Sequence, residues 1–293
     1  MRHPYASAQY AACFSPPNTV IEHREWSTYL VERSIPRSTA VDVAGLYPIS
    51  AIAPSANLPA GLEELRNAGF VSVVLVADPL WGAEADQLAS SFSICRPFKT
   101  HHVVAPERAL TFSSDLRRKI RRAQSSCAIR FCPLAACLDE WVRLFSALSA
   151  RHQIGGMGAF SRDAFVKMQE TPGLLAAVAD AQGETVAITL WIRFRDKLYY
   201  HLGASSERGY KLRASFGLFG AVIERYREAT IDLGGCAGLR DDPEDGLWKF
   251  KRGFANASVM AMLCGAVLDE EKYAALTAGL RSDFFPEYRV PHA

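Results

Sequence analysis

The stretch LLAAVADAQGETVAITLWIRFRDKLYYHLG, residues 174–203, decides the fold. It holds three apolar runs separated by two short polar segments, Asp180–Gly183 and Arg195–Asp196. In the middle run apolar residues recur at every second position, which is the period of a β-strand. Gly183 supplies the positive φ that a tight turn needs. The sequence therefore predicts a three-stranded antiparallel meander.

Helical patterns surround this predicted meander. Ser113 or Ser114 is expected to cap a helix that runs to Ala123, and Ser161 another that ends near Gln169. After the meander, a helix over residues 214–228 leads to a strand at 230–233, which predicts a parallel crossover. The remaining expected elements are strands at 101–104, 128–131 and 258–263, and helices at 135–152, from 244 and at 270–280.

The first hundred residues are harder to interpret because proline and glycine interrupt them often. Residues 61–69 are expected to form a short helix that ends at a glycine. The β-branched run at 70–76 is expected to form a buried strand. No internal repeat and no low-complexity tract is visible.

The composition is that of an ordinary globular protein. The chain has 293 residues, 49% hydrophobic and 22% charged, with a net charge of only +2. That charge does not by itself indicate a nucleic-acid-binding protein. No apolar run is long enough to span a membrane, and the first fourteen residues lack the apolar core of a secretory signal. Seven scattered cysteines favour a reduced, cytoplasmic protein with free thiols.

Four short motifs carry a resemblance to a known family. They are LRRKIRRA at 116–123, YYHLGAS at 199–205, IDLGG at 231–235 and FKRGF at 250–254. Their order resembles that of the FemABX-like or BioF-associated branch of the GNAT acyltransferase superfamily, over roughly residues 107–280. The resemblance implies an α/β (α+β) fold with a GNAT-type mixed sheet. It also implies tandem GNAT-like halves: residues 1–105 a degenerate half or cap, and 106–293 the catalytic half.

The resemblance also implies an activity. Such proteins transfer an acyl or aminoacyl group to an amine, and the best known take it from aminoacyl-tRNA. The acceptor expected here is an amine on a peptide, a cell-wall precursor or a natural product, with no tightly bound cofactor. Two departures matter: residues 207–214 lack the usual GNAT loop for the CoA pyrophosphate, and no long helical arm is present. An acyl-CoA-dependent transferase and a non-catalytic binding module remain alternatives.

Several residues are candidates for the chemistry. The resemblance assigns Lys251 to stabilise the developing oxyanion, with Phe250 shaping the pocket; the alternative is an exposed lysine. Tyr200 and His201 should point to opposite faces of their strand. His201 is a candidate proton acceptor, or else a core histidine. Asp232, at a strand end, is a candidate base or orienting group, or else a helix cap.

Two basic segments are candidates for binding phosphate. Arg208, Tyr210, Lys211 and Arg213 lie between a strand end and a helix N-terminus, where backbone amides attract anions. They are expected to hold a substrate phosphate, or else to form an ordinary polar loop. A second group could contact the tRNA backbone or form a solvated face, with Leu116 and Ile120 turned inward. Its members are Arg117, Arg118, Lys119, Arg121 and Arg122.

Other reactive residues fit established sites poorly. Cys236 has no visible histidine or asparagine partner, so a thiol nucleophile is not favoured. The spacing of Cys127, Cys132 and Cys137 is not that of a zinc site. The acidic residues at 241–245 fit the N-terminus of the next helix better than a metal site. No metal is therefore expected.

Overall fold

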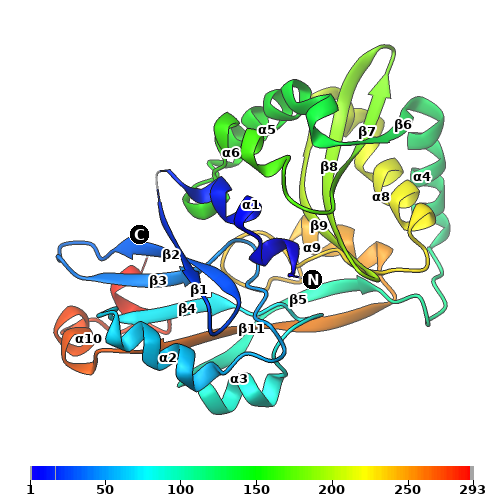
Figure 1. Ribbon diagram of the computed structural model, residues 1–293. Coiled ribbons are helices and arrows are strands. Elements are labelled where there is room, and N and C mark those ends of the chain that lie inside the picture. The colour runs from blue at the N-terminus through cyan, green and yellow to red at the C-terminus, as the bar shows by residue number, and fades with distance from the viewer. Residues whose placement is uncertain (1, 17, 291–293) are drawn as a thin grey trace. The chain divides into compact units, whose positions relative to one another are not determined.

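The computed structural model describes residues 2–16 and 18–290, which fall into two compact units. The first unit comprises Met1–Phe98 and Met260–Ala293, and the second comprises Lys99–Val259. The chain leaves the first unit within β5 (Ile94–Val104) and returns to it within β11 (Ala257–Val267) (Figure 1).

The second unit is built on the predicted meander. Strands β7 (Leu174–Ala181), β8 (Glu184–Phe194) and β9 (Lys197–Ser205) pair antiparallel in sequence order. At one edge β6 (Ala128–Cys132) pairs antiparallel with β7. Beyond β9 lies β10 (Thr230–Asp232), parallel to β9 and antiparallel to β5. The parallel crossover predicted between β9 and β10 is confirmed.

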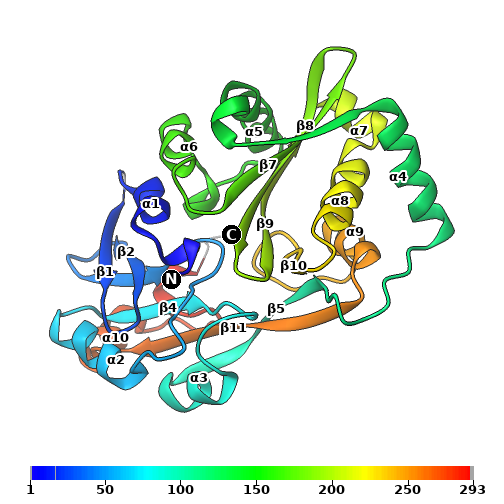
Figure 2. The same cartoon turned by 45° about the vertical axis from the view of Figure 1, so that its right-hand side comes forward.

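Helices cover both faces of this meander. Helix α5 (Leu138–His152) and helix α8 (Ala214–Arg225) lie on opposite sides of it, as Figure 2 shows. The Ser113 and Ser161 side chains cap their helices as predicted. The other helices are α4 (Ser114–Ser126), α6 (Arg162–Met168) and α9 (Gly246–Phe254).

One segment of the second unit differs from the prediction. Residues expected to form a loop after β9 instead form a short helix, α7 (Glu207–Leu212). The Ser206 side chain accepts a hydrogen bond from the Gly209 amide, which caps the N-terminus of α7. Arg213 then takes a left-handed conformation, with φ of +57°, and α8 begins at the next residue. Polar composition alone did not reveal this turn of helix.

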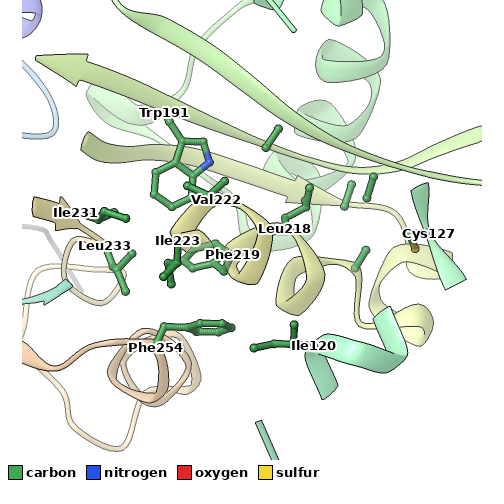
Figure 3. Packing of buried hydrophobic residues seen from close by; sticks show 14 of the residues in the cluster. Ile120, Cys127, Trp191, Leu218, Phe219, Val222, Ile223, Ile231, Leu233 and Phe254 are labelled. Carbon is green, nitrogen blue, oxygen red and sulfur yellow. The ribbon is translucent and has the colours of Figure 1, made fainter. Parts of the chain in front are cut away.

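Aromatic packing fixes α9 against α8. The Phe219 ring lies 4.8 Å from the Phe250 ring and 5.4 Å from the Phe254 ring, measured between centroids. Trp191 of β8 lies 5.3 Å from Phe219 on the other side (Figure 3). Aromatic pairs at such distances are stabilising beyond their buried area. Because Lys251 lies three residues before Phe254, this packing turns Lys251 inward as well.

The first unit contains its own mixed sheet, in the order β1-β2-β3-β4-β11. Strand β3 is parallel to β4, with α2 between them in sequence, whereas the other neighbours are antiparallel. The sequence predicted α2 and β4 but not the three strands before them. The elements are β1 (Thr19–His23), β2 (Thr28–Ser34), β3 (Val41–Gly45), β4 (Ser72–Val76), α1 (Ala8–Ala11), α2 (Leu58–Asn67), α3 (Ala85–Ser91) and α10 (Glu270–Thr277).

A buried carboxylate ties the C-terminal segment to this unit. Asp42 is fully buried and binds the guanidinium groups of Arg33 and Arg289, and the Tyr288 hydroxyl donates to it at 3.0 Å. Residues 260–290 therefore pack with the first unit. The division into a half over 1–105 and a half over 106–293 concerns homology, which compactness does not test, and it stays a prediction.

The α+β class, the mixed sheet and the antiparallel meander are confirmed. Each unit carries strands and helices of its own, which matches the expected tandem arrangement. Within residues 2–16 and 18–290, no helix combines the length and the apolar character needed to cross a membrane.

Candidate acyl-transfer site in the second unit

Asp232 lies at the end of β10 and is 3% exposed. Its two carboxylate oxygens have different partners: Oδ2 lies 2.8 Å from His101 Nδ1, and Oδ1 accepts a hydrogen bond from the Gly234 amide at 2.7 Å. Burial alone would raise the pKa of Asp232, but His101 and the Gly234 amide lower it below its ordinary value. Asp232 therefore stays ionised while it is hydrogen-bonded to His101.

Lys251 lies inside the same unit and is 4% exposed. Its ammonium donates a hydrogen bond to the Gly235 carbonyl at 2.5 Å and sits 5.0 Å from the centre of the Tyr200 ring. The pKa of Lys251 is lowered to about 8, mainly by burial; Asp232 opposes this lowering and Lys99 adds to it. Lys251 is thus a buried cation rather than an exposed lysine.

A second buried lysine organises the loop after β10. The Lys99 ammonium donates to three successive carbonyls, those of Cys236 at 2.8 Å, Ala237 at 3.2 Å and Gly238. Together Lys99 and Lys251 bind the four carbonyls of residues 235–238. Burial is the largest influence on the pKa of Lys99 and lowers it. The carbonyls of this loop are therefore held by two ammonium groups rather than by pairing with a neighbouring strand.

Tyr200 and His201 face opposite sides of β9, as predicted. The Tyr200 ring packs 5.1 Å from Phe219 of α8, on the Lys251 side. His201 is 4% exposed, and its ring lies 6.1 Å from that of Phe160. The strand register steps from Trp191 opposite Tyr200 to Leu190 opposite Leu202, so His201 is the extra residue of a β-bulge.

The surroundings of His201 bear on its suggested role. Burial lowers the pKa of His201 to about 3, so its imidazole is neutral at physiological pH. The structure brings Tyr200, Asp232, Phe250 and Lys251 into one region but places His201 on the other face of β9. Its role as proton acceptor stays a prediction, as does the chemical role of Asp232.

The predicted phosphate-binding group is divided between different surroundings. Arg208 pairs with Glu184 at 3.2 Å and also binds Gln182, across the β7–β8 turn. Tyr210 is 49% exposed, and the Arg151 guanidinium lies 5.1 Å from its ring centre. Lys211 lies in the last turn of α7, and Arg213 is the N-cap residue of α8. Phosphate binding by this group stays a prediction.

The basic helix α4 has the predicted inner face, with Leu116 and Ile120 buried. Its cations are not equivalent. Asp115 pairs with Arg118 and with Lys119, each at 2.6 Å. Arg117 donates to the Phe112 carbonyl. Arg121 and Arg122 are exposed, and no ion pair is recorded for either within the described ranges. These two are the cations most available to a polyanion.

The cysteines behave as expected from the sequence. All seven are free thiols, and Cys236 donates to the Arg240 carbonyl at 3.1 Å. No cluster of three or more His, Cys, Asp or Glu side chains suited to a metal occurs in residues 2–16 and 18–290.

Sequence reasoning missed Lys99, His101 and His102 as parts of the site. The long-range pairing of β5 with β10 brings them there: the His102 carbonyl accepts from the Leu233 amide at 2.8 Å. Two adjacent histidines in a predicted strand were the available signal. Without the partner strand, that signal could not be tied to Asp232.

Comparison with known proteins identifies the domain. Residues 111–252 match the family model described as "Acetyltransferase (GNAT) domain". The chain carries a GNAT domain. The matched residues lie within the second unit and carry the candidate site, so this part of the chain resembles an acyltransferase domain. No curated protein gives a significant match.

Solved structures with similar folds span almost the whole chain. FemX aligns with a TM-score of 0.64 at 11% identity, covering 92% of this chain and 93% of FemX. The C-terminal domain of a putative lysylphosphatidylglycerol synthetase from Agrobacterium fabrum aligns with a TM-score of 0.61 at 14% identity. That alignment covers 94% of this chain and 95% of the other.

A third solved structure, L-PGS from Bacillus licheniformis, aligns with a TM-score of 0.59 at 12% identity, covering 94% and 95% of the two chains. At such low identities these likenesses establish a shared fold. The family model confirms the resemblance to the GNAT superfamily over residues 111–252, and the chain shares the fold of FemX.

The hydrogen bonds from Lys99 predict how the loop after β10 responds when this lysine is replaced. Lys99→Met should leave the cores intact but free three carbonyls, each losing a hydrogen bond to a charged donor that contributes about 1.5–3 kcal/mol. Tryptic cleavage after Arg240 should then be faster by at least about 10-fold. Lys272→Met, at an exposed lysine of α10, is the matched control and should leave cleavage unchanged. Equal cleavage rates in both variants would show that Lys99 does not order the loop.

Proposed function

We propose that the second unit transfers an aminoacyl group from aminoacyl-tRNA to an amine acceptor and forms an amide bond. The observation that carries the proposal is the buried Lys251 ammonium beside Tyr200 and Phe250 in a GNAT domain. The exposed cations of α4 support the tRNA part of the proposal. The acceptor is an amine on a peptide or a small molecule, and the protein needs no tightly bound cofactor.

The reaction can be written with balanced atoms. The acceptor nitrogen attacks the acyl carbonyl carbon, the new C–N bond forms, and the ester C–O bond to the tRNA ribose breaks. The amine loses a proton and the leaving ribose oxygen gains one. Negative charge develops on the carbonyl oxygen in between. Because an ammonium offers three donors and Gly235 uses one, Lys251 can donate another hydrogen bond to that oxygen.

An acyl-CoA donor is the second candidate. It is favoured by the family model, which describes an acetyltransferase domain. Against it stand the altered segment after β9, which is helical, and the pairing of Arg208 with Glu184. A module that binds without catalysis is the third candidate. In that case the protein catalyses no acyl transfer, and replacing the buried Lys251 changes no reaction rate.

The first prediction concerns Lys251. Lys251→Ala should reduce turnover by roughly 100-fold or more, which is the usual effect of removing one oxyanion-stabilising group. Lys249→Ala is the matched control, because Lys249 is exposed on the same helix and pairs only at the surface with Glu244. Transfer is measured with the donor that the protein uses, and folding is checked by circular dichroism. Equal turnover in the two variants would show that Lys251 is not the oxyanion-stabilising group.

The second prediction concerns the donor. Bulk aminoacylated tRNA should bind more weakly as salt rises, and Arg121→Ala with Arg122→Ala should flatten that dependence by up to about two units of slope. Arg227→Ala, at another exposed arginine of the same unit, is the control and should change the slope little. Acetyl-CoA should not raise the melting temperature. A rise in melting temperature with acetyl-CoA, without tRNA binding, would instead favour acyl-CoA as the donor.

A further inference from the structure

Two buried polar atoms near Lys251 have no hydrogen-bond partner within the described part of the chain. They are Nε2 of His102 and Nε1 of Trp248. His102 is 3% exposed, and its ring lies edge-on to Trp248 with 4.7 Å between centroids. Leaving such an atom unpaired in the interior costs about 1–3 kcal/mol. Two such atoms in neighbouring rings therefore indicate a place where a ligand can supply the missing hydrogen-bond partners.

The backbone places this pair next to the Lys251 loop. The His102 amide donates to the Gly234 carbonyl at 3.3 Å, and Lys251 binds the carbonyl of the following residue. Trp248 lies on α9, one turn before Lys251, and its backbone amide is held by the Asp245 side chain at 2.9 Å. The Arg252 guanidinium lies 5.3 Å from the Trp248 ring centre. Both rings are thus fixed by their own elements.

The neighbouring histidine has a different environment. His101 points to the opposite face of β5 and is bound to Asp232, so its Nδ1 is already occupied. Among the described residues, Nε2 of His102 is a fully buried ring nitrogen without a hydrogen-bond partner, whereas His101 has no such fully buried unpaired nitrogen. His102 therefore does not take part in the hydrogen bonds that Asp232 makes.

Burial, with the cations around it, keeps His102 neutral. The pKa of His102 is lowered to about 4: burial is the largest cause, Lys251, Arg252 and His101 add to it, and Asp241 opposes it. At physiological pH the ring is therefore an uncharged hydrogen-bond partner. The cations beside it also disfavour a protonated amine, so an amine that enters this place is held in its neutral, nucleophilic form.

We infer that His102 and Trp248 form the subsite that holds the acceptor amine beside Lys251. In this subsite His102 Nε2 accepts a hydrogen bond from the amine, and the indole N–H of Trp248 donates to an oxygen of the same molecule. The ligand class is a neutral amine that carries a carbonyl or hydroxyl oxygen nearby. The inference deepens the proposed function and rests on it, because the subsite is useful only if an amine is acylated there.

The test is a binding titration that needs no turnover. The probe is glycinamide, which carries an amine and a carbonyl, added at a pH where its amine is neutral to protein labelled with nitrogen-15 in histidine. The His102 signal, identified by its loss in His102→Phe, should shift and saturate. Trp248→Phe keeps the ring but removes the indole N–H and should weaken binding at least about 5-fold. Acetamide, which lacks the amine, should also bind at least about 5-fold more weakly than glycinamide.

A stability measurement separates this role from a structural one. If the unpaired imidazole serves ligand binding, His102→Phe should leave the melting temperature unchanged or raise it. A titration without a saturable His102 shift, or equal binding of glycinamide and acetamide, overturns the inference, whatever the melting temperature. Loss of transfer on Lys251→Ala tests the proposed function separately. If glycinamide shifts the His102 signal but Lys251→Ala leaves transfer unchanged, the proposed chemistry is overturned and the subsite is not.

Discussion

Holding one ammonium group out of water is the constraint on which the candidate site depends. Lys251 is nearly fully buried, and an unpaired charge in such a place would be very unfavourable. The Gly235 carbonyl, the face of Tyr200 and the ionised Asp232 offset that cost. Each of these partners comes from a different element. The positions of β9, β10 and α9 are therefore coupled through a single side chain.

The aromatic cluster provides the rigid support for this arrangement. Phe219 of α8 contacts Phe250 and Phe254 of α9 and also Trp191 of β8. Rings that interdigitate in this way leave little freedom to the helix that carries Lys251. In the proposed reaction, a charge held in this way would need no reorganisation before it stabilises the oxyanion. Hydrophobic packing and electrostatics here serve one purpose.

The sequence predicted the parts of the fold that local patterns determine. The meander at 174–203 and the serine-capped helices α4 and α6 follow from periodicity and capping chemistry, and all are confirmed. Strands β1 to β3 were missed because they are short and interrupted by polar residues. Helix α7 was missed because a six-residue helix leaves almost no periodic signal.

The candidate site was predictable only in part. The motif at 250–254 pointed to Lys251, and strand alternation separated Tyr200 from His201. Lys99 and His102 come from a strand whose pairing partner lies about 130 residues away, as the 2.8 Å contact between His101 and Asp232 shows. Such long-range pairing is not encoded in any local pattern.

The pKa of Lys251 is the most direct test of this account. It can be measured by following the carbon-13 shift of the lysine ε-carbons with pH, with the Lys251 signal assigned from Lys251→Ala. The account predicts titration near pH 8, because burial disfavours the charged form and Asp232 only partly restores it. A value near 10.5, the ordinary value for lysine, would show that the ammonium is solvated and would contradict a buried oxyanion-stabilising charge.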